Sequence, residues 1–170
     1  MRKLLNITID GKPSKVEPDT TILNSAKEMG IKIPTLCYHP AIEPYASCRV
    51  CTVEMRRGKR VRMVTACNFP IQDDGIEVFT QSERALRARK LVVELLLARS
   101  PFAEPVRAIA RELGIERTRY PLENDPCILC GICVQVCSQL VGANAISFIS
   151  RGIDRKVDTP FKIISDDCIG

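Results

Sequence analysis

Cysteine is the residue whose number and spacing give this chain its chemistry. Eight of the nine cysteines in the 170 residues form two groups, and the ninth, Cys168, lies two residues before the end. The first group has the pattern C-x10-C-x2-C-x15-C and consists of Cys37, Cys48, Cys51 and Cys67. The second has the pattern C-x2-C-x2-C-x3-C and consists of Cys127, Cys130, Cys133 and Cys137. Thiolates gathered at such spacings bind soft metals, and iron–sulfur clusters held this way move single electrons.

A disulfide framework is the first alternative to this interpretation. The N-terminal stretch MRKLLNITIDGKPSK has a charged start but no apolar run of the length that a signal peptide needs. The longest apolar stretch, residues 91–98, is interrupted by Glu94 and is too short to span a bilayer. We therefore expect a cytoplasmic protein without direct membrane insertion, where clustered cysteines indicate metal or redox sites.

Composition and charge indicate the type of core and the kinds of partner that the chain can have. Hydrophobic residues make up 45% of the chain, aromatic residues only 5%, and Trp is absent, so the core must be mostly aliphatic. The net charge of +5 is modest, with basic residues concentrated at 56–62 and 84–90. Because no aromatic residues alternate with them, we interpret these segments as a solvated turn and a solvated helix face, and expect no nucleic-acid partner.

The order of predicted elements defines an α+β fold. Residues 3–9 and 14–16 are expected to form two strands around the turn Asp10–Gly11. A helix over 21–29 follows, with Thr20 or Thr21 as its cap, and then an irregular stretch over 33–47. Three further strands are predicted, at 52–56, 60–65 and 76–79. Strand, turn, strand, helix, loop and strands in this order are typical of a β-grasp domain.

A helical linker is predicted after this domain. Thr80-x-x-Glu83 is a candidate capping box for a helix that runs to about Arg99. A shorter helix is expected over 105–113. The apolar stripes of both helices are expected either to pack within the chain or to dock a partner. We thus predict three parts: a β-grasp domain over 1–80, a linker over 81–119, and a second cysteine-containing domain over 120–170.

The first cysteine group suits a [2Fe–2S] cluster. Such a cluster needs four thiolates, and its sulfides accept hydrogen bonds from a loop that wraps it. Four-cysteine zinc is the alternative, but it usually uses two CxxC units and this group has one. His39 is the only histidine, whereas a Rieske-type site needs two, so it is expected to be a neighbouring or packing residue. We also expect Arg49, beside Cys48, to stabilise the reduced cluster.

The residues around this group resemble a known family. The stretches PTLCYHPAIEPYASCRVCTVEM and TACNFP are similar to the N-terminal [2Fe–2S] domain of the large iron–sulfur subunit of complex I. The same domain begins [FeFe]-hydrogenases, the diaphorase part of NAD-reducing hydrogenases and some NAD-linked formate dehydrogenases. The resemblance covers about residues 3–80, and it implies a β-grasp fold. It also implies partner subunits, namely a flavoprotein that oxidises NAD(P)H and a catalytic subunit.

The second group is the run of bacterial ferredoxins, which predicts a ferredoxin-like [4Fe–4S] domain. Cys127, Cys130 and Cys133 supply three corners of a first cube. By the rule for two-cluster ferredoxins, Cys137 and Cys168 belong to a second cube. The alternative is a single cube in which Cys168 is the fourth ligand and Cys137 is spare. Because the end of the sequence has the form of an interrupted motif, the domain looks truncated, and we expect the natural polypeptide to be longer.

Two departures from these patterns are visible. Ser138 stands where the bacterial run has proline. In complex I and [FeFe]-hydrogenases, a cluster with one histidine and three cysteine ligands follows the long helix. Residues 100–114 of this chain contain neither His nor Cys, so we expect no cluster there.

The sequence therefore predicts an electron-transfer subunit or module with no catalytic side chains of its own. It has no glycine fingerprint for a dinucleotide, so we expect a partner to handle the nicotinamide. One alternative is the N-terminal cluster region of a larger hydrogenase or formate dehydrogenase chain. An alternative of another class is a structural module that binds zinc.

Overall fold

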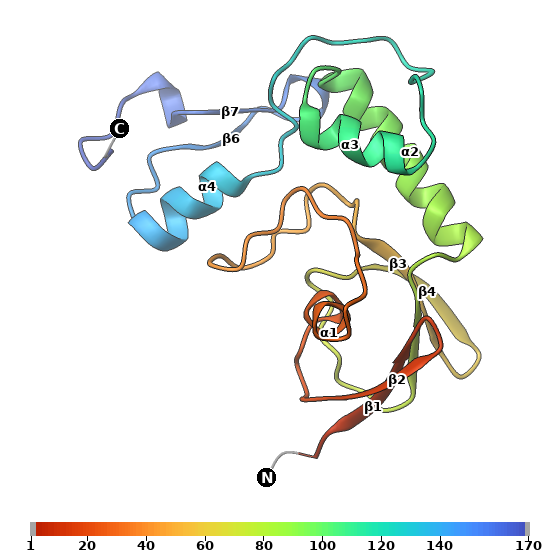
Figure 1. Ribbon diagram of the computed structural model, residues 1–170. Coiled ribbons are helices and arrows are strands. Elements are labelled where there is room, and N and C mark those ends of the chain that lie inside the picture. Colours follow the sequence, from red (N-terminus) through yellow and green to blue (C-terminus); the bar gives the residue numbers. More distant parts are fainter. Residues whose placement is uncertain (1–2, 169–170) are drawn as a thin grey trace.

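A five-stranded mixed sheet with one helix on it forms the N-terminal half of the chain (Figure 1). The computed structural model describes residues 3–168. In this half the elements are β1 Leu5–Ile9, β2 Lys12–Val16, α1 Ile22–Glu28, β3 Thr52–Arg57, β4 Arg60–Thr65 and β5 Ile76–Phe79. The strand order is β2-β1-β5-β3-β4, in which β1 and β5 are parallel and the other pairs antiparallel. This topology confirms the predicted α+β, β-grasp fold.

Local sequence accounts for these elements. Asp10 and Gly11 both adopt positive φ, at 49° and 78°, which gives the tight turn between β1 and β2. The side chain of Thr21 caps α1 by accepting a hydrogen bond from the backbone N–H of Asn24 at 3.2 Å. Alternate residues of the strands face α1 and bury an aliphatic core, as the composition predicted.

Two helices follow the sheet and pack against each other: α2 Glu83–Arg99 and α3 Glu104–Glu112. The predicted capping box at Thr80 is wrong. Ser82 caps α2, with its hydroxyl accepting the N–H of Ala85 at 3.2 Å. The Thr80 hydroxyl instead donates to the carboxylate of Asp10 at 2.6 Å, so a tertiary partner occupies it.

The C-terminal part is small and less buried. Its elements are α4 Ile132–Val136, a π-helical turn Cys137–Val141, β6 Ser147–Ile149, a 3₁₀ turn Gly152–Asp154, β7 Lys156–Asp158 and a 3₁₀ turn Pro160–Lys162. β6 and β7 pair as an antiparallel ribbon. Figure 1 places this part beside the α2–α3 pair and above the long loop that joins α1 to β3. No helix within residues 3–168 is both long and apolar enough to cross a membrane.

Candidate metal centres

The first cysteine group is buried where the long loop meets the sheet. Cys37, Cys48, Cys51 and Cys67 expose only 1–5% of their surface. The first three belong to the loop between α1 and β3, and Cys67 follows β4. Within that loop Ala46 is buried with a positive φ of 57°, a conformation that tightens the chain just before Cys48. All four predicted ligands are therefore buried at this junction and closed to solvent.

Strand register brings Cys67 to Cys51. β3 begins at Thr52 and pairs antiparallel with β4, so that Thr52 lies opposite Thr65. The next pair along continues the ladder, because the N–H of Ala66 donates to the carbonyl of Cys51 at 3.1 Å. The N-terminus of α1 holds the same turn, since the N–H of Leu23 donates to the carbonyl of Ala66 at 2.9 Å. A ligand that is 16 residues away in the sequence thus becomes a neighbour.

The four thiols form two hydrogen-bonded pairs. The bond from Cys37 lowers the pKa of the Cys48 thiol to about 6, and the same contact together with burial raises the pKa of Cys37. The bond from Cys67 lowers the pKa of Cys51, while it raises that of Cys67. The backbone N–H of Cys48 also donates to the sulfur of Cys37 at 3.4 Å. Since metal ligands must be thiolates, metal binding at this site has to release the protons that each pair shares.

The two pairs of thiols suit a two-iron cluster, which takes two protein ligands on each iron. In residues 3–168, no three His, Cys, Asp or Glu side chains converge on one point. His39 has a local role instead, because its Nδ1 accepts the N–H of Ala41 at 3.2 Å.

The second cysteine group surrounds α4 and is more exposed. Cys127, Cys130 and Cys137 are half-buried, and Cys133 is exposed. Two sulfurs already accept backbone hydrogen bonds: Cys127 from Leu129 at 3.4 Å and Cys137 from Ala145 at 3.2 Å. Cys168 is also exposed and lies at the edge of the described residues. The structure places the ferredoxin-type run on one loop and helix, but within the described part of the chain it does not assemble these sulfurs around a common centre.

The long loop connects the two groups. The hydroxyl of Ser47 donates to the carbonyl of Leu129 at 2.8 Å. Each of these residues directly precedes a cysteine, namely Cys48 and Cys130. Cys37 and Cys48 belong to an apolar cluster against which Ile128 and Cys130 also pack. The two candidate centres therefore share one hydrophobic environment.

An aromatic contact lies beside this hydrogen bond. Tyr45 stacks on Phe148 of β6 with ring centroids 5.9 Å apart, and Arg155 lies over the Phe148 ring at 4.0 Å. Gly131 adopts a φ of +78° directly beside this pair. A Cβ atom at Gly131 would lie 3.0 Å from Phe148 and 3.5 Å from Tyr45, so a larger residue would strain the backbone and crowd the Phe148 ring.

Arg99 at the end of α2 binds the segment that begins the second cysteine group. Its Nε donates to the carbonyl of Cys127 at 2.8 Å, and its guanidinium pairs with Asp125. Asp125 in turn accepts the N–H of Cys127 at 2.8 Å. The first cysteine of the run is thereby tied to a helix that packs on the first group.

Two buried charged residues near the first group escaped the sequence analysis. Arg89 of α2 and Glu54 of β3 are each only 2% exposed. Arg89 was included in a basic segment interpreted as a solvated face, which is wrong for this residue. The available signal was its position four residues from both Ala85 and Val93, on the buried stripe of α2. Leu86, which was expected on that stripe, is only half-buried.

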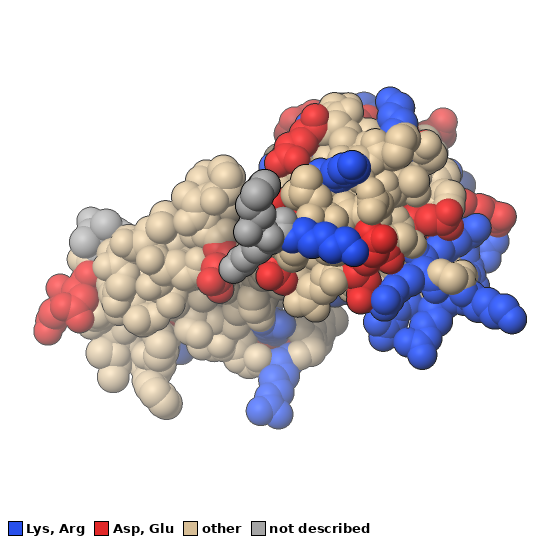
Figure 2. All heavy atoms as spheres, turned by 90° about the horizontal axis from the view of Figure 1, so that it is seen from below, with Lys and Arg blue, Asp and Glu red and all other residues tan. Residues whose placement is uncertain are grey.

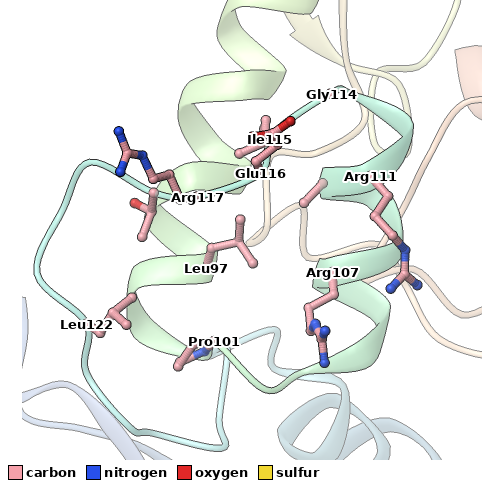
Figure 3. A pocket seen from close by; sticks show the side chains of 11 residues that line it. Leu97, Pro101, Arg107, Arg111, Gly114, Ile115, Glu116, Arg117 and Leu122 are labelled. Atoms are coloured by element: carbon pink, nitrogen blue, oxygen red, sulfur yellow. The ribbon is translucent and has the colours of Figure 1, made fainter.

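Two further surface features are a pocket, which has no cysteine in its lining, and a basic region. A pocket of about 580 Å³ lies between α2, α3 and residues 114–122, with Leu97 at its floor and Arg107 and Arg111 at its rim (Figure 3). The apolar stripe of α3 packs inside the chain. Figure 2 shows Lys and Arg gathered toward the end of the molecule that carries the exposed tip of the hairpin β3–β4, residues 56–62.

Comparison with known proteins agrees with this geometry. Residues 2–83 match the family described as a 2Fe-2S iron–sulfur cluster binding domain. The NADPH-Fe(3+) oxidoreductase subunit alpha of Geobacter sulfurreducens is 38% identical over 92% of this chain and 21% of its own length. An NADH-quinone oxidoreductase subunit of Rhizobium meliloti is 29% identical over 91% of this chain and 21% of its own length. The chain thus spans about a fifth of the length of these relatives.

A solved structure gives the same result. The crystal structure of an NAD+-reducing [NiFe]-hydrogenase in the H2-reduced state superposes with a TM-score of 0.77 at 28% identity. The match covers 91% of this chain and 74% of that one. Residues 2–83 thus form a 2Fe-2S iron–sulfur cluster binding domain, and the homologues of the chain are subunits of NADH- and NADPH-linked oxidoreductases and hydrogenases. The predicted resemblance is confirmed.

Proposed function

We propose that this chain relays single electrons between a partner that handles flavin or NAD(P)H and a reductase, hydrogenase or dehydrogenase partner. The observation that carries the proposal is that both cysteine groups meet at one apolar cluster, where Cys48 and Cys130 are each adjacent to the Ser47–Leu129 hydrogen bond. Electron transfer requires centres that are close and shielded from water. No acid, base or nucleophile is needed for it, so a chain without catalytic side chains of its own can perform it.

We assign Cys37, Cys48, Cys51 and Cys67 to a [2Fe–2S] cluster. In that assignment the four buried thiols would hold the cluster as thiolates, with Cys37 next to Cys48 and Cys51 next to Cys67. A bound cluster supplies a one-electron redox couple. The protein's part is to exclude water by burial and to direct N–H groups, such as that of Cys48, at the sulfurs. Such hydrogen bonds favour the electron-rich state of a cluster.

We assign the second group to one or two [4Fe–4S] clusters. Cys127, Cys130 and Cys133 are the proposed ligands of the first, and Cys137 and Cys168 of the second. The single-cube arrangement, with Cys168 as fourth ligand, is the alternative. The domain division at residues 1–80, 81–119 and 120–170 belongs to the same proposal. The strongest support is local, since Leu129 and Ala145 already direct N–H groups at the sulfurs of Cys127 and Cys137.

The proposed partners are a flavoprotein subunit that oxidises NAD(P)H and a catalytic subunit. The names of the relatives support this, because they describe subunits of an NADPH-Fe(3+) oxidoreductase and an NADH-quinone oxidoreductase. The setting we propose is the cytoplasm, where thiols stay reduced. Since the chain spans 21% of those relatives, a second interpretation is that it forms the N-terminal cluster region of a larger catalytic chain. The size of the native polypeptide distinguishes the two.

Iron, acid-labile sulfide and zinc should be measured on protein purified without oxygen. About six iron atoms per chain support one cube, and about ten support two. Cys51→Ala should remove the [2Fe–2S] electron paramagnetic resonance (EPR) signal and keep the [4Fe–4S] signal, whereas Cys130→Ala should do the reverse. Zinc without iron or colour would refute electron transfer and support the structural module.

A further inference from the structure

Arg89 is a buried cation beside the first cysteine group. Its guanidinium donates three hydrogen bonds, all to backbone carbonyls: from Nε to Val50 at 3.1 Å, and from Nη2 to Thr52 at 3.1 Å and Thr80 at 3.2 Å. Val50 and Thr52 are the residues on either side of Cys51. One planar guanidinium therefore hydrogen-bonds the backbone on both sides of a proposed cluster ligand, Cys51.

This charge has no carboxylate partner among residues 3–168. The ion pairs of that part of the chain do not include Arg89. A buried charge is costly unless an opposite charge compensates it. Burial disfavours the charged guanidinium and lowers its pKa, whereas the Cys51 thiolate and Asp10 favour it and are the nearest candidates for compensation. Asp10 is already engaged by the N–H and the hydroxyl of Thr80.

We propose that Arg89 is the internal counter-charge of the [2Fe–2S] cluster and that it raises the reduction potential of this cluster. This inference rests on the proposed function, because it assumes a cluster on Cys51. With four thiolates the oxidised cluster carries two negative charges, and reduction adds one electron without a bond or proton change. The electron comes from a partner subunit, or from dithionite in a titration. A fixed cation nearby stabilises the more negative, reduced state.

Arg49 offers a matched control. It lies next to Cys48 in the sequence, but its side chain is exposed to solvent. Water and salt screen an exposed charge much more than a buried one. Comparing variants of the two arginines therefore shows whether adjacency in sequence or burial in the fold determines the effect on the reduction potential.

The test is an EPR-monitored redox titration of the [2Fe–2S] signal in Arg89→Gln, Arg89→Lys and Arg49→Gln. Arg89→Gln should shift the reduction equilibrium about tenfold toward the oxidised cluster, which is about 59 mV for one electron. Arg49→Gln should shift it about twofold or less. Arg89→Lys should keep the potential close to wild type, because the ammonium retains the positive charge. It should lower the melting temperature, because an ammonium cannot reproduce the planar set of hydrogen bonds that the guanidinium makes.

The outcomes are distinguishable from failure of the proposed function. If wild-type protein shows no [2Fe–2S] signal, the proposed function fails. If the wild type has the signal and Arg89→Gln retains it at an unchanged potential, the counter-charge proposal fails alone. If Arg89→Gln does not fold, Arg89→Lys decides, since a tenfold shift with the charge retained would overturn the proposal and an unchanged potential would support it.

Discussion

Replacing Gly131 with alanine tests how the C-terminal part is held against the long loop. Gly131 has a φ of +78°, and an added Cβ would lie 3.0 Å from Phe148 and 3.5 Å from Tyr45. Gly142 has the same φ of +78°, but nothing lies within 4 Å of its Cβ position. Gly142→Ala is therefore a control that carries the same backbone strain without the close contact.

The expected magnitudes follow from these two geometries. An L-residue with left-handed φ costs about 1–2 kcal/mol, which both variants share. Crowding a packed contact adds about 1–3 kcal/mol, which only Gly131→Ala incurs. Phe148 cannot retreat freely, because Tyr45 stacks on it and Arg155 lies over its ring. We expect Gly131→Ala to be destabilised by about 2–5 kcal/mol and Gly142→Ala by about 1–2 kcal/mol.

Amide hydrogen exchange measured by mass spectrometry is the suitable assay, since it follows local opening segment by segment. Peptides that cover residues 145–158 should exchange about 5-fold to 150-fold faster in Gly131→Ala than in Gly142→Ala, because the extra cost is about 1–3 kcal/mol and each 1.4 kcal/mol is a factor of about ten. Equal exchange in the two variants would refute the close contact as the reason for glycine. Exchange at the wild-type rate in Gly131→Ala would also refute the expected cost of placing alanine at a positive φ.

Three further predictions concern residues around the cysteine groups. Glu54 accepts hydrogen bonds from Arg56 and Ser82, which lower its pKa. Its stabilisation is therefore complete above the unfolded pKa of about 4.3 and is lost as the pH falls through the lower folded value. Denaturation curves of Glu54→Gln and wild type should differ at about pH 6 and converge in acid, and a constant difference would contradict this. Arg99→Lys should retain its charge but lose the bond to Cys127, which lowers [4Fe–4S] content while the [2Fe–2S] signal persists; equal loss of both signals would count against it. Ser47→Ala should weaken the contact with Leu129 by about 1 kcal/mol and speed exchange in peptides around Leu129, with both potentials unchanged; unaltered exchange would refute a stabilising role for the bond.

The sheet was predictable because its signals are local. The turn at Asp10–Gly11 and the alternation of buried residues are properties of a few neighbouring positions, and they specify strands and register together. That register alone then carries Cys67 to Cys51, so the closing ligand follows from the hairpin β3–β4. The spacing of the second group predicted ligands for [4Fe–4S] clusters, but nothing in the local sequence predicted the contact of Tyr45 with Phe148, because neither stretch specifies a partner about a hundred residues away.

The cap of α2 shows how a distant residue overrides a local rule. Thr80 and Ser82 are both suitable cap residues by type, and Thr80 also has Glu83 three positions later. Asp10, 70 residues earlier, accepts hydrogen bonds from both the N–H and the hydroxyl of Thr80. The threonine is thereby fixed to the turn that follows β1, and the helix is capped by the next suitable residue, Ser82. The sequence near α2 therefore does not show that Thr80 is bound by Asp10 and unable to cap the helix.

Arg49 and Arg89 extend this argument to electrostatics. Sequence adjacency selects Arg49, because a residue beside Cys48 must be close to any cluster bound there. Burial makes Arg89 the stronger candidate for an electrostatic effect on the proposed cluster, because water screens an exposed charge far more than a charge inside the protein. The hydrogen bonds of Arg89 to the carbonyls of Val50 and Thr52 span 39 and 37 residues of sequence. Under the proposed cluster assignment, α2 contributes a charge to the surroundings of that cluster, and we therefore propose that α2 is part of the electron-transfer unit and more than a linker.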